Sequence, residues 1–331
     1  MFARAVSSLS VLALAGAAIA VAGAGLRAAD VSGDKLAVGV LRRDGIAIPF
    51  ATFDGKRWRK DWPEPRQTLD VPAALSSVPS RWWGPFKPIE TWQAWIASEP
   101  ARTLQVRQPD WYDAHCVHQV GLRTDYRSKQ PPPDPRAQPY PKDGLVVSPP
   151  QAQSSIDRID IVAPGSPMPP VIDAFNEAEH KAIRRFEDRG KHPVKEAQRG
   201  AVPLKVEAMY ATGNPTSTRI YYVEVSKQYY YTDSFNPDAR FGRCAMVSYG
   251  AGWFIRDGNG PLKPLGFDVA VVPCHRETIR YMFPLGAIRI AGRLFWIAQW
   301  SGWDYEEYTI VEIKPEKDKT EVALRVWGGG C

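Results

Sequence analysis

The spacing of apolar residues along the chain predicts mostly β-structure. Apolar side chains recur at every second position along 36–40 and again along 46–50, and Asp44–Gly45 lies between the two runs. A period of two places alternate side chains on one face of a strand, and Asp-Gly suits a tight hairpin turn. From residue 203 onward, aromatic and β-branched segments such as RIYYVEV and RLFWIAQW follow one another with short connections. The predicted fold class is all-β and mostly antiparallel, either β-propeller-like or a large sandwich.

One segment breaks this pattern and predicts a single amphipathic helix at 171–189. Its apolar residues fall three or four positions apart, prolines precede it and Gly190 follows it. Residues 129–142, with the sequence KQPPPDPRAQPYPK, predict an extended Pro-rich loop at the surface. We interpret residues 30–331 as one β-rich domain that includes this loop and this helix.

The N-terminal segment has the pattern of a secretory signal peptide. Arg4 precedes an apolar run, which ends in Ala22–Gly23–Ala24, a small-x-small cleavage pattern. We predict a signal peptide over residues 1–24, with cleavage as late as residue 29 as an alternative. The expected location is therefore secreted or periplasmic. The mature chain has no apolar run long enough for a membrane span.

Export changes the interpretation of the four cysteines, because disulfides are the default in an oxidising compartment. Four cysteines allow three pairings, and the sequence does not choose among them. Cys244 and Cys274 lie in one strand-rich stretch, so we favour that pair. Cys116 and Cys331 would then tie the glycine-rich C-terminal tail to the body of the protein.

The segment HCVH at 115–118 raises two alternatives to a disulfide. If residues 115–123 form one strand, Cys116 and His118 share a face and supply two ligands of a metal site. Alternatively, a free Cys116 thiol is a nucleophile with His118 as its base. In an exported protein the disulfide is the favoured interpretation, and we expect no metal or other cofactor.

Charge and carboxylate spacing point to no particular reaction. The formal net charge of +6 is mild, and the densest basic run, at 56–60, is short, so we expect no nucleic-acid partner. Asp304 and Glu306 are expected to share a strand face, about 7 Å apart, and paired carboxylates can hydrolyse glycosides. A solvated strand face near a turn is the simpler interpretation. The sequence contains no Gly-x-Ser-x-Gly motif and no Gly-rich phosphate loop.

Aromatic residues supply the remaining candidate site. Four tryptophans in an early irregular region are the predicted ligand contacts, since loops often carry binding: Trp58, Trp62, Trp82 and Trp83. The first hypothesis is an exported binding or envelope-associated protein without catalysis, with carbohydrate as a candidate ligand. The alternatives are a polysaccharide hydrolase and a Cys/His metal protein. The expected partner is an envelope polysaccharide or another exported protein.

Overall fold

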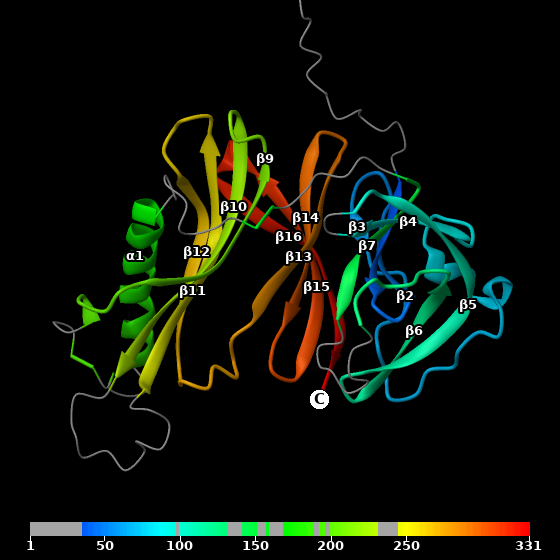
Figure 1. Ribbon diagram of the computed structural model, residues 1–331, viewed down its shortest axis with the longest axis horizontal. Helices are drawn as coiled ribbons and strands as arrows, with labels where there is room; N and C mark the ends of the chain where they lie inside the picture. The colour runs from blue at the N-terminus through cyan, green and yellow to red at the C-terminus, as the bar shows by residue number, and fades with distance from the viewer. Residues whose placement is uncertain are drawn as a thin grey trace, which may run out of the picture.

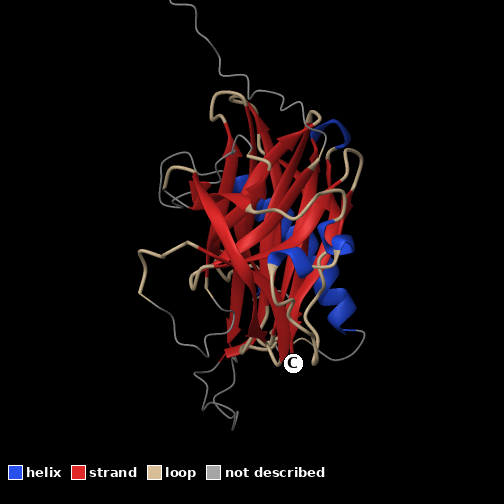
Figure 2. Cartoon of the chain, turned by 90° about the vertical axis from the view of Figure 1, so that its right-hand side faces the viewer, coloured by secondary structure: helices blue, strands red, loops and turns tan. Residues whose placement is uncertain are grey.

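The fold is built from three antiparallel sheets and one α-helix, which confirms the predicted class. The computed structural model describes residues 35–96, 99–131, 141–150, 157–158, 168–187, 192, 194–195, 199–230 and 244–331. The predicted signal peptide lies outside these residues. Strands make up most of the described chain, and Figure 2 shows them running through the whole body. No helix in the described ranges is both long and apolar enough to cross a membrane.

The N-terminal half forms a closed sheet of six strands, here called the barrel sheet. Its order is β1-β7-β4-β5-β6-β2, and the pairing of β1 with β2 closes it. The bounds are Leu36–Arg42 for β1, Ile46–Phe53 for β2, Thr91–Ile96 for β4, Arg102–Ala114 for β5, Val117–Thr124 for β6 and Lys142–Ser148 for β7. The short strand β3, Trp58–Arg59, extends β2 at the edge, and two 3₁₀ turns, Leu75–Ser77 and Ser80–Trp83, lie in the following loop.

Two open sheets follow in sequence. The five-stranded sheet has the order β12-β11-β10-β9-β8, and the four-stranded sheet has the order β13-β14-β15-β16. The first contains β8 Asp157–Arg158, β9 Lys205–Gly213, β10 Thr218–Tyr230, β11 Cys244–Asp257 and β12 Lys263–Val272. The second contains β13 Tyr281–Ile290, β14 Arg293–Ser301, β15 Tyr305–Lys314 and β16 Lys319–Gly330, with a 3₁₀ turn at Pro315–Lys317.

The elements stack in four layers, which Figure 1 shows from left to right: α1, the five-stranded sheet, the four-stranded sheet and the barrel sheet. Each junction has its own apolar core. Phe175 of α1 packs with Val223 under the helix, Trp253 meets Trp296 between the open sheets, and Phe53 meets Phe295 beside the barrel sheet. The face-to-face pair of open sheets corresponds to the sandwich arrangement, and the closed sheet is an additional unit.

The predicted helix and Pro-rich loop fall at or close to their expected positions. Helix α1 spans Met168–Glu187, and its apolar stripe covers β11 and β12. Residues 188–189 of the predicted helix lie outside the described residues. Residues 129–131 and 141 of the predicted loop are not in a strand, β7 begins at Lys142, and residues 132–140 lie outside the described ranges.

Candidate functional site

His115 and Cys116 form the hairpin turn between β5 and β6, and Val117 and His118 begin β6, which corrects the prediction of a strand over 115–123. Ala114 pairs with Val117, and the two residues between them have positive φ angles, 41° for His115 and 65° for Cys116. A two-residue turn with positive φ at both positions matches the right-handed twist of the strands it joins. Cys116 therefore lies outside the strand pattern and does not share a strand face with His118.

Both disulfides favoured from the sequence are present. Cys116 bonds to Cys331 with a Cα–Cα distance of 5.3 Å, and Cys244 bonds to Cys274 with a Cα–Cα distance of 6.1 Å. A disulfide sulfur is not the thiolate that zinc binding or nucleophilic attack requires. The structure therefore does not support the Cys116–His118 metal site or a Cys116 nucleophile. Among the described residues, no three His, Cys, Asp or Glu side chains are arranged to hold a metal ion.

The two histidines of the HCVH segment have different surroundings. His115 is buried, and its Nε2 lies 3.9 Å from Oε2 of Glu306. His118 is partly exposed, and its Nδ1 lies 2.9 Å from Oδ1 of Asp113. The backbone of His118 is bridged to Arg66 by two hydrogen bonds of 2.9 and 2.8 Å. The backbone of His118 therefore holds the loop at Arg66 in place, and His115 contributes its ring to the interior.

The structure separates Asp304 from Glu306, which corrects the prediction of a shared strand face. Strand β15 begins at Tyr305, so Asp304 stays in the preceding turn. Glu306 lies between the barrel sheet and the four-stranded sheet and is 2% exposed. Lys142 Nζ donates to its two oxygens at 2.8 and 2.9 Å, and the Tyr308 hydroxyl also donates to it. Glu306 is therefore engaged in an internal ion pair.

Burial and charge act in opposite directions on this ion pair. Burial lowers the pKa of Lys142 and would raise the pKa of Glu306. The Lys142 ammonium, with the hydrogen bond from Tyr308 and the nearby His115 ring, nevertheless holds the pKa of Glu306 below its ordinary value. Both carboxylate oxygens of Glu306 thus accept hydrogen bonds from buried side chains, so we interpret Glu306 as a structural group.

The early tryptophans are mainly core residues. Trp58, Trp62 and Trp83 are each 5% exposed or less, and Trp82 is half-buried. Trp58 packs against Phe53 and Phe295, which joins the barrel sheet to the four-stranded sheet. Trp62 donates its indole N–H to the Val120 carbonyl at 2.9 Å. Three of the four predicted ligand contacts therefore have no free ring face in this fold.

The exposed tryptophans lie elsewhere, around an open groove at the C-terminus. The groove has a volume of about 770 Å³ and is lined by Arg66, Gln67, Thr68, Val117, Asp304, Tyr305, Trp327, Gly330 and Cys331. We call it the C-terminal groove. Trp327 is 38% exposed, and Trp303, next to Asp304 in the turn, is 72% exposed. Trp111 on β5, 51% exposed, packs edge-on against His118 on the paired strand β6.

Several covalent and backbone contacts hold the groove together. The Cys116–Cys331 bond joins the end of the chain to the β5–β6 turn, and the Cys331 N–H donates to the Asp304 carbonyl at 3.0 Å. The Trp327 N–H donates to Glu64 Oε1 at 3.2 Å. Gly329 has a φ of +130°, and a Cβ there would lie 2.7 Å from the Ala114 carbonyl oxygen. Only glycine allows β16 to approach the turn this closely.

A pair of arginines lies beside the groove on the four-stranded sheet. Arg280 Nη1 and Arg325 Nε lie 3.4 and 3.6 Å from the same oxygen of Glu307. The Arg280 guanidinium also lies 4.8 Å from the ring centroid of Tyr305, a groove residue. Glu307 is paired across the strands with Trp327, so the two arginines border the aromatic wall of the groove.

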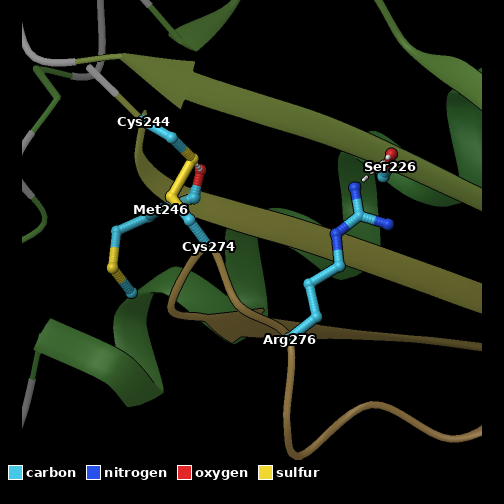
Figure 3. The surroundings of a disulfide bond; sticks show 5 residues. All are labelled: Ser226, Cys244, Met246, Cys274 and Arg276. Carbon is cyan, nitrogen blue, oxygen red and sulfur yellow. Dashed lines mark hydrogen bonds between the residues drawn. A yellow bond between two sulfur atoms is a disulfide. The ribbon is translucent and has the colours of Figure 1, made fainter. Parts of the chain in front are cut away.

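A second polar cluster lies beside the other disulfide. Arg276, two residues after Cys274, reaches toward Ser226 on β10 (Figure 3) and donates to both oxygens of Glu207 at 2.7 and 2.9 Å. The nearby Glu224 is 3% exposed and accepts the Met282 N–H at 2.8 Å. Burial raises the pKa of Glu224 to about 7. Because Glu224 is enclosed and connects the two open sheets, we interpret it as a structural group that titrates near neutrality.

Sequence reasoning missed the C-terminal groove because its members are far apart in the chain. The available signal in the sequence was the position of two tryptophans: Trp303 follows Gly302 in a turn, and Trp327 precedes the glycine-rich tail. Comparison of the chain with protein-family models, with curated proteins and with solved structures gives no match. The site is therefore defined by its own geometry: an aromatic groove, closed by a disulfide, on an all-β scaffold.

Proposed function

We propose that the chain is an exported carbohydrate-binding protein and that the C-terminal groove is its sugar site. The observation that carries this proposal is an open groove lined by the exposed Trp327 and by Asp304, with the exposed Trp303 next to Asp304 in the turn. Tryptophan and tyrosine are enriched at binding surfaces, because their rings supply apolar area and a polar group together.

A sugar ring matches this combination of side chains. One face of a pyranose carries C–H groups that pack on an indole, while its edge carries hydroxyls that need hydrogen-bond partners. Trp327 and Tyr305 supply ring surface, and Asp304, Gln67 and Thr68 supply donors and acceptors. Since the groove is open rather than enclosed, a segment of a longer glycan can lie along it, as an envelope polysaccharide would.

Binding without hydrolysis fits the lining of the groove. Glycoside hydrolysis ordinarily uses two carboxyl groups that flank the scissile bond. Of the described residues that line the groove, Asp304 alone is acidic. The second carboxylate expected from the sequence, Glu306, is bonded to Lys142 in the interior. The proposal therefore keeps Asp304 as a ligand contact and gives Glu306 a structural role.

Export is the second part of the proposal, and two features support it. The N-terminal segment has the charge, apolar run and small-residue pattern of a signal peptide. The cysteines at 116, 331, 244 and 274 are paired, as expected for a protein that folds in an oxidising compartment.

Calorimetric titration with oligosaccharides tests the assignment of the groove. We expect the exported protein to bind at least one glycan from a panel of neutral and acidic oligomers. Trp327→Ala should weaken that binding by about tenfold or more, because it removes an exposed ring that lines the groove, and Trp303→Ala should weaken it as well, because Trp303 adjoins the lining residue Asp304.

Trp82→Ala is the matched comparison, since Trp82 is one of the four contacts predicted from sequence and lies in the early loop. The groove assignment predicts that Trp82→Ala lowers stability but leaves glycan affinity unchanged. Loss of affinity in Trp82→Ala with full affinity in the two groove variants would move the site to the early loop. Absence of binding to every glycan would remove the proposed function.

A further inference from the structure

Beside the C-terminal groove, two arginines share one carboxylate oxygen and retain donors for another partner. Arg280 and Arg325 are 47% and 55% exposed, whereas Glu307 between them is 11% exposed. Both contacts to Glu307 are longer than the roughly 2.7–2.9 Å typical of a charge-assisted hydrogen bond. Each guanidinium carries five N–H donors, so a single shared oxygen leaves most of them available.

The arginines and the aromatic wall lie on one face of the four-stranded sheet. Tyr305 and Glu307 are two residues apart on β15, and Arg325 and Trp327 are two residues apart on β16. Residues two apart on a strand point to the same side. Arg325 is opposite Thr309 and Trp327 is opposite Glu307, which brings the two pairs onto a common face. Arg280 enters this face from the residue before β13 and contacts Tyr305.

Three arginines lie at or beside the groove. Arg66 lines it and Arg280 and Arg325 border it, and the nearby carboxylates are those of Asp304, Glu307 and Glu64, whose Oε1 accepts the Trp327 N–H. Because the guanidinium groups of Arg280 and Arg325 are planar and each can donate two parallel hydrogen bonds, the partner that fits them best is another planar carboxylate. A ligand that stacks on Trp327 would place a carboxylate substituent within reach of this pair.

We propose that the C-terminal groove selects glycans built from uronic acids, with Arg280 and Arg325 binding the sugar carboxylate. This inference rests on the proposed carbohydrate-binding function and names the ligand class of the same groove. In the bound state the sugar carboxylate competes with Glu307 for the two guanidiniums. In the unbound state, the Glu307 carboxylate contacts both arginines and keeps their guanidinium groups close together.

The experiment compares each acidic oligomer with its neutral counterpart. Oligomers of galacturonic, mannuronic and glucuronic acid are titrated into the protein, and each is also titrated as the fully methyl-esterified form. Methyl esterification removes the charge but keeps the sugar ring and its hydroxyls. We expect the acidic form to bind at least tenfold more tightly, with an affinity that falls as salt is raised.

Variants identify the residues responsible. Arg280→Gln and Arg325→Gln should each lower affinity for the acidic oligomer by about tenfold and leave affinity for the ester nearly unchanged. Glu307→Gln should raise affinity for the acidic oligomer, because it removes the competing carboxylate. Arg289→Gln is the control, since Arg289 lies at the opposite end of β13 and is exposed. It should bind both forms as the wild type does.

The two proposals fail in different ways. Equal affinity for the acid and its ester, with both affinities lost in Trp327→Ala, would overturn the uronate inference and leave the glycan function standing. A preference for the acid that survives in Arg280→Gln and Arg325→Gln would also overturn it. Failure of every acid and every ester to bind would overturn both proposals together.

Discussion

Glu306 and Lys142 form an ion pair in which the side chains are 3% and 2% exposed. Breaking such a pair leaves one buried charge without a partner, which costs more than the pair itself contributes. We expect Glu306→Gln to lower the free energy of unfolding by about 3 kcal/mol, measured by urea denaturation. Lys142→Met combined with Glu306→Gln should recover part of this loss, because no unpaired ammonium remains.

Glu321→Gln is the control for this prediction. Glu321 lies on β16 of the same sheet, pairs with Lys314 and is about half exposed, so its substitution should leave the unfolding free energy nearly unchanged. An equally small effect for Glu306→Gln would show that the buried pair does not have the role assigned to it.

Glu224 predicts a particular pH dependence of stability. Its pKa is raised by burial from 4.5 to about 7 in the folded chain. Below pH 4.5 the group is protonated in both states and has no effect. Between about pH 4.5 and 7 the folded state keeps a proton that the unfolded state has lost, so raising the pH destabilises the fold. Above about pH 7 the penalty is constant, up to about 3 kcal/mol.

Glu224→Gln removes this titration while keeping an acceptor for the Met282 N–H. We expect the variant to equal the wild type in stability near pH 4.5 and to exceed it at pH 8, with unfolding curves recorded across that interval. Parallel pH profiles for the two proteins would show that Glu224 is not a titrating group in this range.

The two disulfides constrain different elements and should differ in their effects. The Cys116–Cys331 bond closes a separation of 215 residues and holds one side of the C-terminal groove. The Cys244–Cys274 bond closes a separation of 30 residues in the five-stranded sheet region. Chain-entropy arguments give about 5 kcal/mol for the long loop and about 4 kcal/mol for the short one.

We therefore expect replacement of Cys116 and Cys331 by serine to reduce both stability and glycan affinity. The same change at Cys244 and Cys274 should reduce stability and leave glycan affinity close to that of the wild type. Denaturation and calorimetric titration on both double variants provide the measurement. Equal loss of affinity in the two variants would mean that the tail bond has no special role in the groove.

At the level of elements, the sequence predicted what local periodicity controls. The alternating apolar runs identified β1 and β2, both faces of which are buried in the structure, and the 3.6-residue stripe identified α1, which buries one face. It misplaced the β5–β6 turn because His115 and Cys116 are not the Asn-Gly or Asp-Gly residues that mark such turns. Because this turn was misplaced, Cys116 was wrongly expected to share a strand face with His118.

At the level of the whole molecule, prediction was limited by long-range packing. Trp58, Trp62 and Trp83 were expected in an irregular surface region, but all three are core residues. Trp58 fills the core between the barrel sheet and the four-stranded sheet, and Trp62 and Trp83 fill a core between the barrel sheet and its own loop. Asp304 and Glu306 are two residues apart, yet one lies in a groove and the other faces Lys142, 164 residues away. Only the stacking of sheets decides which side chains remain exposed.

The same stacking brings the C-terminal groove together from three distant parts of the chain. The loop at Arg66, the start of β6 and the ends of the β15–β16 pair meet near the C-terminus, which Figure 1 places between the four-stranded sheet and the barrel sheet. A glycan bound there would contact the two units at once. We therefore expect ligand binding to raise the thermal stability of the whole protein, as mass action requires for a ligand of the folded state.

The central claim, that the C-terminal groove binds sugar, is tested most directly by nuclear magnetic resonance of the tryptophan indole N–H groups during a glycan titration. The chain has 12 tryptophans, and substitution of single residues assigns their signals. The groove assignment predicts that the signals of Trp303 and Trp327 shift with ligand concentration while those of Trp58, Trp62 and Trp83 stay in place. Shifts confined to Trp82 and its neighbours, with Trp303 and Trp327 unchanged, would contradict it.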